Sequence, residues 1–268
     1  MSELNKQNER LNFLLEGFRA DSKNYKDIKI PSDGGDKMRI LRSLMNIRMP
    51  GRMSDAIIKI QDEYLQECAN EKGIIELSDI AIAKDNISIW QGDITRLKLD
   101  AIVNAANSQM LGCFIPMHTC IDNQIHTFAG IQLREECNSK MNDLRKLYGN
   151  NYEQPTAIPM LTDAYNLPAK KVIHIVGPIV DSRLTSKKEE ELALCYENTL
   201  NMCQANDLRS VAFCCISTGV FHFPNRKAAE IATATVQKWN IEHQGAMDRI
   251  VFNVFKDGDR EYYEEFLQ

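Results

Sequence analysis

The sequence predicts an α/β protein with a largely parallel sheet, preceded by a helical extension. From about residue 86 onward, short apolar runs alternate with stretches of helical periodicity. This alternation is typical of strand–helix units, in which helices connect parallel strands. Before that point only helical periodicity is visible. We therefore expect two parts, a helical N-terminal extension over residues 1–85 and an α/β domain over residues 86–268.

Composition and charge exclude several classes of protein. The 268 residues are 44 % hydrophobic and 26 % charged, which suits one large globular domain with an extension. The net charge of −5 argues against nucleic-acid binding, which normally uses a basic patch. No apolar run approaches the roughly 20 residues of a membrane span, so no membrane partner is expected. The eight cysteines do not form a secreted disulfide framework, which favours a cytoplasmic location.

Three helices are expected in the extension. Apolar residues within 11–18 fall on one helical face. A second helix is expected over Arg39 to Met49 and should stop at Pro50. Ser54 is a candidate cap for a third helix, which Gly73 should end. No chemistry is visible here, so we expect these helices to pack on the main domain. A module for partner docking or substrate gating is the alternative.

The main domain should contain alternating strands and helices. The expected strands are 87–90, 101–103, 171–176, 210–216 and 249–255. The expected helices are 124–141, 187–206, 225–243 and a short one from Asp259. Ligands of such sheets bind off the carboxyl ends of the strands. The segments that follow the strands are therefore the place to look for a site.

Three of these segments carry polar or glycine-containing motifs. Asp93 ends the first strand, and Asn104-Ala105-Ala106-Asn107 ends the second. The loop Ser217–Phe221 joins a strand to a helix and can offer several N–H groups to an anion. Each signal is weak by itself, because many α/β proteins have such a loop and a turn aspartate is common.

The segment after Asn107 is longer and chemically richer than a simple connection. Cys113, His118 and Cys120 have the spacing C-x4-H-x-C, so all three can reach one point. Thiolate and imidazole suit Zn²⁺, and three protein ligands leave a fourth position open, as in catalytic zinc sites. The alternative is that these cysteines are structural, since cysteine often behaves as a small buried hydrophobe.

Taken together, these stretches resemble the macrodomain family, and specifically its zinc-containing protein-ADP-ribose hydrolase branch. The resemblance covers about residues 75–268. The matching residues are Gly92–Thr95, Asp100–Asn107, Leu111–Cys113, Pro116–Asp122, Ile125-His126, Ala129-Gly130, Tyr165–Ala169, His174–Pro178 and Ser217–Phe221. It implies a three-layer α/β/α macrodomain with a mixed, largely parallel central sheet and ADP-ribose as the ligand.

The resemblance also implies roles for individual residues. Asp93 would bind the adenine amine with the Ile94 backbone beside it, and Phe255 would stack on adenine. Asn104 and Asn107 would face the distal ribose. The residues expected to hold the diphosphate and its surroundings are Ser217, Thr218, Gly219, Val220 and Phe221, opposite Ile121, Asp122 and Asn123. Zn²⁺ would be the cofactor, bound by Cys113, His118 and Cys120.

The implied activity is a zinc-dependent hydrolase that removes mono-ADP-ribose from modified proteins, from acidic side chains. Asp122, Asn107 and Asn104 are the expected catalytic residues. Two divisions of labour stay open: zinc positions the substrate while Asp122 manages the water, or a zinc-bound hydroxide attacks. Two other functions share the same pocket, an ADP-ribose-binding reader module and an O-acetyl-ADP-ribose deacetylase.

The remaining histidines and cysteines are expected to be structural. His126 is predicted to be a structural hydrogen bonder or, alternatively, a support for the metal ligands. His174 is predicted to be a satisfied core histidine, and His222 to line the pocket. The cysteines expected in the core are Cys137, Cys195, Cys203, Cys214 and Cys215.

Overall fold

A computed structural model describes residues 3–268 of the chain. In chain order its elements are α1 (Glu3–Asp21), α2 (Gly34–Ile47), α3 (Asp55–Lys72), β1 (Ile75–Glu76), the short 3-10 helix η1 (Leu77–Asp79), β2 (Ile87–Gln91), η2 (Ile94–Arg96), β3 (Leu97–Lys98), β4 (Ala101–Ala106), α4 (Ile121–Ala129), α5 (Ile131–Tyr148), β5 (Met160–Asp163), β6 (Lys171–Val176), α6 (Ser186–Ala205), β7 (Ser210–Phe213), α7 (Asn225–Glu242), β8 (Arg249–Val254) and α8 (Asp257–Phe266).

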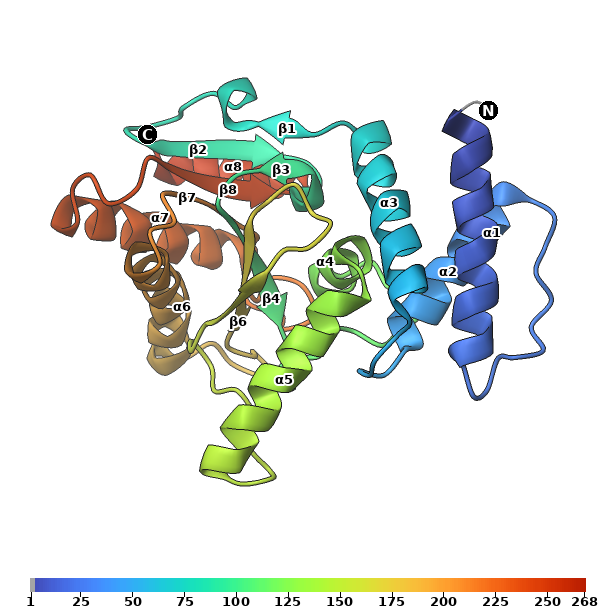
Figure 1. Cartoon of the computed structure of the whole chain (residues 1–268). Helices are drawn as coiled ribbons and strands as arrows, with labels where there is room; N and C mark the ends of the chain where they lie inside the picture. The colour runs from blue at the N-terminus through green and yellow to red at the C-terminus, as the bar shows by residue number, and fades with distance from the viewer. Residues whose placement is uncertain (1–2) are drawn as a thin grey trace.

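A six-stranded sheet forms the centre of the main domain. Its strand order is β2-β8-β7-β4-β6-β5. All neighbouring pairs are parallel except β5 with β6, which is antiparallel. In Figure 1, α4 and α5 lie to one side of the sheet and α6 and α7 to the other, while α8 packs against β2 and β8. The expected three-layer α/β/α architecture with a mixed, largely parallel sheet is confirmed.

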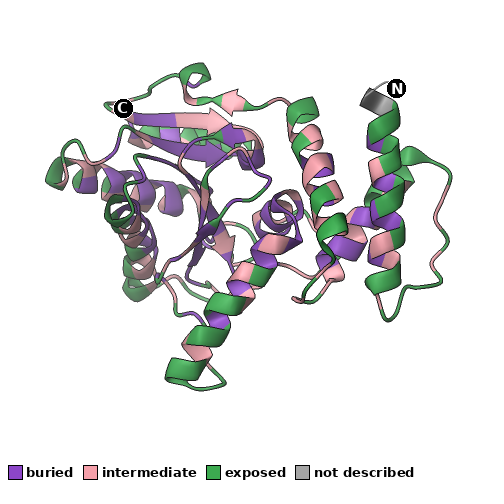
Figure 2. Ribbon diagram, viewed as in Figure 1, coloured by how far each residue is buried: buried purple, intermediate pink, exposed green. Residues whose placement is uncertain are grey.

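The inner strands are buried on both faces because helices cover both. All four residues of β7 are buried, as are five of the six in β4, β6 and β8. Figure 2 shows the sheet as the buried centre and the far end of α5 as exposed. Strands in this setting are nearly continuous apolar runs, which is why they were recognisable in the sequence. A buried polar residue in such a strand therefore needs a specific partner.

The helix expected over residues 124–141 is wrong as a single element, because it is two helices separated at Gly130. Gly130 has φ 93°, a conformation that disfavours other residues. A Cβ there would lie 2.7 Å from Nε2 of Gln61 and 3.0 Å from Nδ2 of Asn166. The N–H of Ile131 donates to Oε1 of Gln61 at 3.2 Å. The chain turns here because α3 of the extension approaches the backbone closely.

The structure also contains one strand that was not predicted, and one predicted strand ends earlier than expected. β5 was not expected from the sequence; Met160–Asp163 pairs antiparallel with β6 at the sheet edge. The strand expected over residues 210–216 ends at Phe213, and the following residues form an irregular loop before α7. The other expected helices and strands of the main domain are present, with ends shifted by a few residues.

The extension forms a small helical unit with its own apolar core. Helices α1, α2 and α3 bury Leu14, Phe18 and Leu44 among themselves, and Ile131 is the buried main-domain residue in this cluster. The expected boundary at residue 85 shifts toward the N-terminus. β1 pairs with β3, and Ile80 belongs to the core of the main domain. Figure 1 shows α2 and α3 beside α4, so the extension contacts the main domain at the helix that follows the Cys/His/Cys segment.

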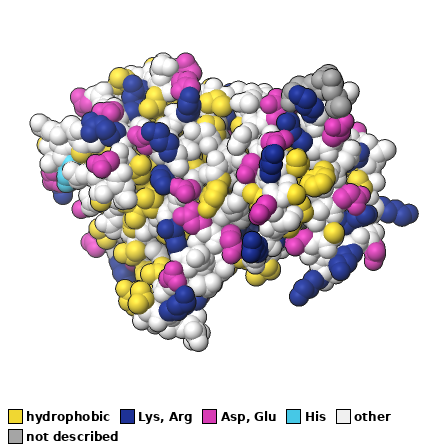
Figure 3. Space-filling view, in the orientation of Figure 1, with side chains coloured by type: hydrophobic (Ala, Val, Ile, Leu, Met, Phe, Trp, Pro, Cys, Tyr) yellow, Lys and Arg dark blue, Asp and Glu magenta, His cyan; other side chains and the backbone are white. Residues whose placement is uncertain are grey.

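The described helices and surface add two observations. Within residues 3–268, no helix has both the length and the apolar character that crossing a bilayer requires. On the face seen in Figure 3, Lys and Arg side chains lie among Asp and Glu side chains.

Candidate active site at the carboxyl edge of the sheet

The predicted site segments follow four neighbouring parallel strands. Asp93 follows β2, Phe255 follows β8, the loop 217–221 follows β7, and Asn107 follows β4. Adjacent strands are about 4.8 Å apart, so β2 and β4 are separated by about 14 Å. This distance fits an extended dinucleotide-like ligand. The order along the edge puts the predicted adenine contacts at one end and the predicted distal-ribose contacts at the other.

The three predicted metal ligands converge. The Sγ atoms of Cys113 and Cys120 and a ring nitrogen of His118 all lie within 4.8 Å of one another. Sγ of Cys113 is 3.6 Å from Nδ1 of His118. A tetrahedral Zn²⁺ with bonds of about 2.1–2.3 Å sets neighbouring ligand atoms about 3.5–3.8 Å apart. The donor set and its spacing therefore fit Zn²⁺.

The predicted metal-binding loop, residues 113–120, is held at both ends by the first turn of α4. Cys120 is the N-cap of α4, and its Sγ accepts from the N–H of Asn123 at 3.4 Å. The Nδ2 group of Asn123 donates to the carbonyls of Ile115 and Cys113, at 2.9 and 3.3 Å. Asn123 is fully buried, so its side chain braces this loop. A contact between Asn123 and ADP-ribose remains a prediction.

Asp122 is a buried carboxylate beside these ligands. It is 5 % exposed, and its Oδ1 accepts from Nδ2 of Asn104 at 2.8 Å. Nδ2 of Asn107 approaches the other oxygen at 3.4 Å. Burial raises the pKa of Asp122 to about 6, although the Asn104 hydrogen bond and the charge of Arg134 partly oppose the shift. The structure thus brings together the three predicted catalytic residues.

Asn104 is held from behind by a residue on the neighbouring strand. Nδ2 of Asn104 lies 3.0 Å from Nδ1 of His174, its register partner in β6. An amide nitrogen can only donate, so Nδ1 accepts and the hydrogen of the neutral ring is on Nε2. That nitrogen lies 3.0 Å from Oγ1 of Thr162. Burial lowers the pKa of His174 to about 3, which keeps the ring neutral. The prediction of a satisfied core histidine is confirmed.

The prediction that His126 is a structural hydrogen bonder is wrong. It is 5 % exposed, and within residues 3–268 neither ring nitrogen has a hydrogen-bond partner. Nε2 lies 3.6 Å from Oδ1 of Asp122. Burial lowers the pKa of His126 well below its usual value. His126 is thus a neutral ring packed against the predicted catalytic carboxylate.

His126, Cys137 and His174 form a second group with ligand-like atoms within 4.8 Å of one another. Both nitrogens of His174 are engaged, and burial raises the pKa of the Cys137 thiol. The group therefore consists of two neutral imidazole rings and a protonated thiol, and its His174 supports Asn104. The sequence did carry a signal for it: His174 interrupts an apolar strand and pairs in register with Asn104, another polar residue in a buried strand.

At the predicted adenine end, Asp93 combines a local role with an unexpected partner. Its Oδ1 accepts from the N–H and hydroxyl of Thr95, at 3.0 and 2.6 Å, which starts η2. Its Oδ2 lies 3.4 Å from Nζ of Lys72, at the end of α3. Lys72 also sits 3.1 Å from the ring centre of Phe128. Lys72 was not singled out in the sequence, because it lies in the extension and no motif marks it.

Phe255 lies at the same corner as Asp93, since β8 pairs with β2. Its side chain is 76 % exposed. An exposed aromatic ring at the end of a strand is available for stacking on a base. Ile94, predicted to contribute its backbone, is buried directly after Asp93.

The predicted phosphate loop is a tight turn before α7. Ser217 and His222 have φ values of 65° and 55°, and the N–H of Phe223 donates to the carbonyl of Ser217 at 3.0 Å. Among the described residues, none accepts a hydrogen bond from the N–H of Gly219, Val220 or Phe221. Free N–H groups in a turn before a helix suit a phosphate. His222 is exposed beside this loop.

The loop requires a glycine after β6, which is separated from β7 by β4 in the sheet. A Cβ on Gly177, after β6, would lie 2.1 Å from Oγ of Ser217. The Ser217 hydroxyl is buried and has no partner within the described residues. Gly177 therefore sets how closely the two loops approach.

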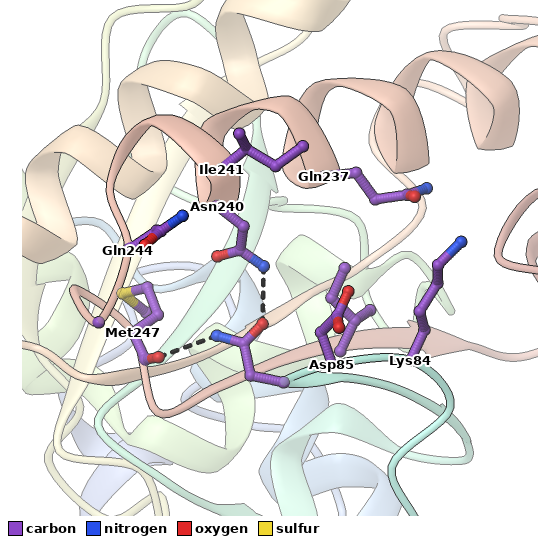
Figure 4. A pocket seen from close by; sticks show the side chains of 10 residues that line it. Lys84, Asp85, Gln237, Asn240, Ile241, Gln244 and Met247 are labelled. Carbon is purple, nitrogen blue, oxygen red and sulfur yellow. Dashed lines mark hydrogen bonds between the residues drawn. The ribbon is translucent and has the colours of Figure 1, made fainter.

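A separate cavity of about 550 Å³ lies between the segment before β2 and the C-terminal part of α7. Figure 4 shows its lining, in which Asn86 bonds to Asn240 and to the carbonyl of Met247. It opens at the amino end of β2, whereas the predicted site residues lie at the carboxyl end. Its amide-rich lining brings together none of the predicted site residues.

Known proteins resemble this chain over almost its whole length. The family model of the Macro domain matches residues 103–232. A protein-ADP-ribose hydrolase of Treponema medium is 46 % identical over 97 % of this chain and 99 % of that protein. A protein-ADP-ribose hydrolase of Staphylococcus aureus is 41 % identical over 100 % of this chain and 98 % of that protein. The Trypanosoma brucei macrodomain in complex with ADP-ribose aligns with TM-score 0.64 and 28 % identity, over 84 % of this chain and 95 % of that one. This chain therefore belongs to the macrodomain family.

Proposed function

We propose that this protein is a hydrolase that releases mono-ADP-ribose from modified proteins, from acidic side chains, with zinc as its cofactor. The observation that carries this proposal is the position of Asp122. A buried carboxylate with a raised pKa lies in the first turn of α4, two residues after Cys120 of the converging Cys/His/Cys set, and against two asparagines. Its near full-length relatives bear the name protein-ADP-ribose hydrolase.

The ligand follows from the order of groups along the sheet edge. Asp93 can accept from an exocyclic amine, and Phe255 can stack on a base. The free N–H groups around Gly219 can bind a diphosphate, and Asn107, which follows β4, can bind the distal ribose. A solved relative of this fold binds ADP-ribose. ADP-ribose attached to a protein is therefore the substrate class we propose.

Asp122 is suited to managing the attacking water. With a pKa of about 6, the Asp122 carboxyl is mostly ionised at neutral pH. This pKa is also close enough to neutral pH for the carboxylate to accept a proton from the water. The Asn104 hydrogen bond fixes the orientation of its carboxyl group. Positive charge that develops on the ribose in the transition state would be stabilised by the same carboxylate.

The Cys113, His118 and Cys120 side chains would hold the metal. Bound Zn²⁺ supplies Lewis-acid polarisation of an oxygen ligand and lowers the pKa of a bound water. The neighbouring Asn123 and Cys120 contacts orient the loop. We further propose a reducing, cytoplasmic setting, in keeping with eight free cysteines of which two are proposed ligands.

The test is release of ADP-ribose from a protein that is mono-ADP-ribosylated on glutamate or aspartate, followed by mass spectrometry. Wild type should release ADP-ribose, and Asp122→Ala should be slower by about a hundredfold or more. Glu197→Ala, at an exposed site on α6, serves as the control and should match wild type. An Asp122→Ala protein with full turnover would remove Asp122 from the chemistry.

Two other results would assign a different function. Tight binding of ADP-ribose without release from any linkage would make the protein an ADP-ribose reader. Faster turnover of free O-acetyl-ADP-ribose than of the modified protein would make it a small-ester hydrolase.

A further inference from the structure

Helix α2 of the extension reaches the metal-binding loop with one guanidinium group. Nη2 of Arg42 donates to the carbonyl of His118 and to Oδ1 of Asn123, both at 2.8 Å. His118 is a proposed metal ligand, and Asn123 braces the loop from the other side. Arg42 thereby links the two groups that determine where the loop lies.

A second side chain of α2 contacts the residue before His118. Met117 has φ 57°, an unfavourable conformation for a residue with a side chain, costing about 1–2 kcal/mol. Its N–H donates to Oδ1 of Asn46 at 3.1 Å. Asn46 is 1 % exposed, and its Nδ2 donates to Oγ1 of Thr127 in α4 at 2.9 Å. Asn46 thus holds a strained backbone in place and ties it to α4.

The main domain fixes the position of α2 in return. Arg134 of α5 is 5 % exposed and donates to the carbonyls of Asn46 and Arg48, at the C-terminal end of α2. It also donates to the carbonyl of Leu111, just before the metal-binding loop, at 2.7 Å. The carbonyls of Asn46 and Arg48 would otherwise be unpaired, because they lie at the C-terminal end of a helix. The guanidinium group connects α2, α5 and the loop entrance.

We propose that α2 contributes to the active site. Its Arg42 and Asn46 are positioning residues that set the geometry of the metal-binding loop. The inference rests on the proposed metal site and extends it to a part of the chain where the sequence shows no chemistry. Two separate side chains of one helix reach consecutive residues of the loop, Met117 and His118. A helix that only covered apolar surface would not need them.

The proposal predicts weaker metal binding when these contacts are removed. Substitutions of groups that orient metal ligands typically lower metal affinity by about 10–100-fold. Arg42→Ala and Asn46→Ala should therefore raise the zinc dissociation constant by about tenfold or more, measured by competition with a chromophoric chelator. Arg42→Lys, which retains a positively charged donor group, should recover part of the loss. Arg39→Ala removes an exposed arginine one turn earlier on α2 and should bind zinc like wild type.

A readout without metal separates this inference from the proposed cofactor. In chelator-treated protein, alkylation of the partly exposed Cys113 and Cys120 reports loop order, and can be followed by mass spectrometry. Arg42→Ala should speed alkylation of both several-fold, while the buried Cys195 stays slow. If zinc does not bind wild type, the cofactor proposal fails, yet this alkylation difference still tests the positioning role.

A double-substitution cycle tests the role of Asn46 directly. Glycine adopts a positive φ without strain, so Met117→Gly should reduce the loss caused by Asn46→Ala. Zinc affinity and alkylation rates in Arg42→Ala and Asn46→Ala that equal those of wild type would overturn the proposal. Equal acceleration at Cys195 would also overturn it, because the effect would then be general loss of stability.

Discussion

Replacing Asp122 by asparagine should stabilise the metal-free protein in a pH-dependent way. The carboxylate is 5 % exposed, and burial raises its pKa from 3.8 to about 6. A shift of this size corresponds to about 3 kcal/mol of unfolding free energy. Asparagine has nearly the same shape and keeps an oxygen that can accept from Asn104.

The sign of this pH dependence follows from whether the folded or the unfolded state ionises first as pH rises. Below pH 3.8 the carboxyl is protonated in both states, and burial of the charge costs nothing. Between pH 3.8 and 6 the unfolded chain ionises first, so wild type loses stability as pH rises. Relative to an uncharged residue, Asp122 costs about 1.6 kcal/mol at pH 5 and about 3 kcal/mol at pH 7.5. Asp122→Asn removes this cost.

The assay is urea unfolding of wild type and Asp122→Asn at pH 5 and at pH 7.5, with chelator present. The stability advantage of the variant should grow by about 1.4 kcal/mol between the two pH values. A pH-independent packing cost of the amide shifts both differences equally and leaves this growth unchanged. A difference that stays constant or shrinks as pH rises would refute the reasoning about burial of the charge.

Three further substitutions test other parts of the site. Gly112→Ala places a Cβ 2.8 Å from the His126 ring at φ 79°, and should cost about 2–4 kcal/mol in urea unfolding; a cost below about 1 kcal/mol would contradict the contact. Gly177→Ala should push the Ser217 hydroxyl and weaken ADP-ribose binding in calorimetry, whereas unchanged affinity would argue against a phosphate loop at 217–221. Asp93→Ala should weaken ADP-ribose binding by about 10–100-fold but not the binding of its inosine analogue, which lacks the amine; equal losses for both ligands would exclude recognition of that amine.

Much of the fold could be predicted because its strands are buried on both faces. The apolar run at 171–176 and the alternation with helices were enough to predict an α/β domain with a largely parallel sheet. The break at Gly130 could not be predicted, because it depends on Gln61, about 70 residues earlier in the chain. β5 was not predicted, because an edge strand of four residues is too short to show a clear periodic pattern of apolar residues.

The Cys/His/Cys part of the site could be predicted, because one short segment carries all three side chains. Cys113, His118 and Cys120 lie within eight positions, so their convergence follows from spacing. The contributions of Arg42 and Lys72 were not predictable, because each reaches the site from the extension through a tertiary contact. The bracing of the loop by the side chain of Asn123 was also not predictable, because it depends on the folded path of the loop.

The most direct test of the account is the rate of ADP-ribose release from a glutamate-modified protein by wild type before chelation, after chelation and after zinc is returned. The account predicts that release stops on chelation and recovers with about one equivalent of zinc, as a single three-ligand site requires. Cys120→Ala should not recover under the same treatment. Turnover that is unaffected by chelation and by Cys120→Ala would contradict the zinc-dependent hydrolase and leave the Cys/His/Cys loop with a structural role.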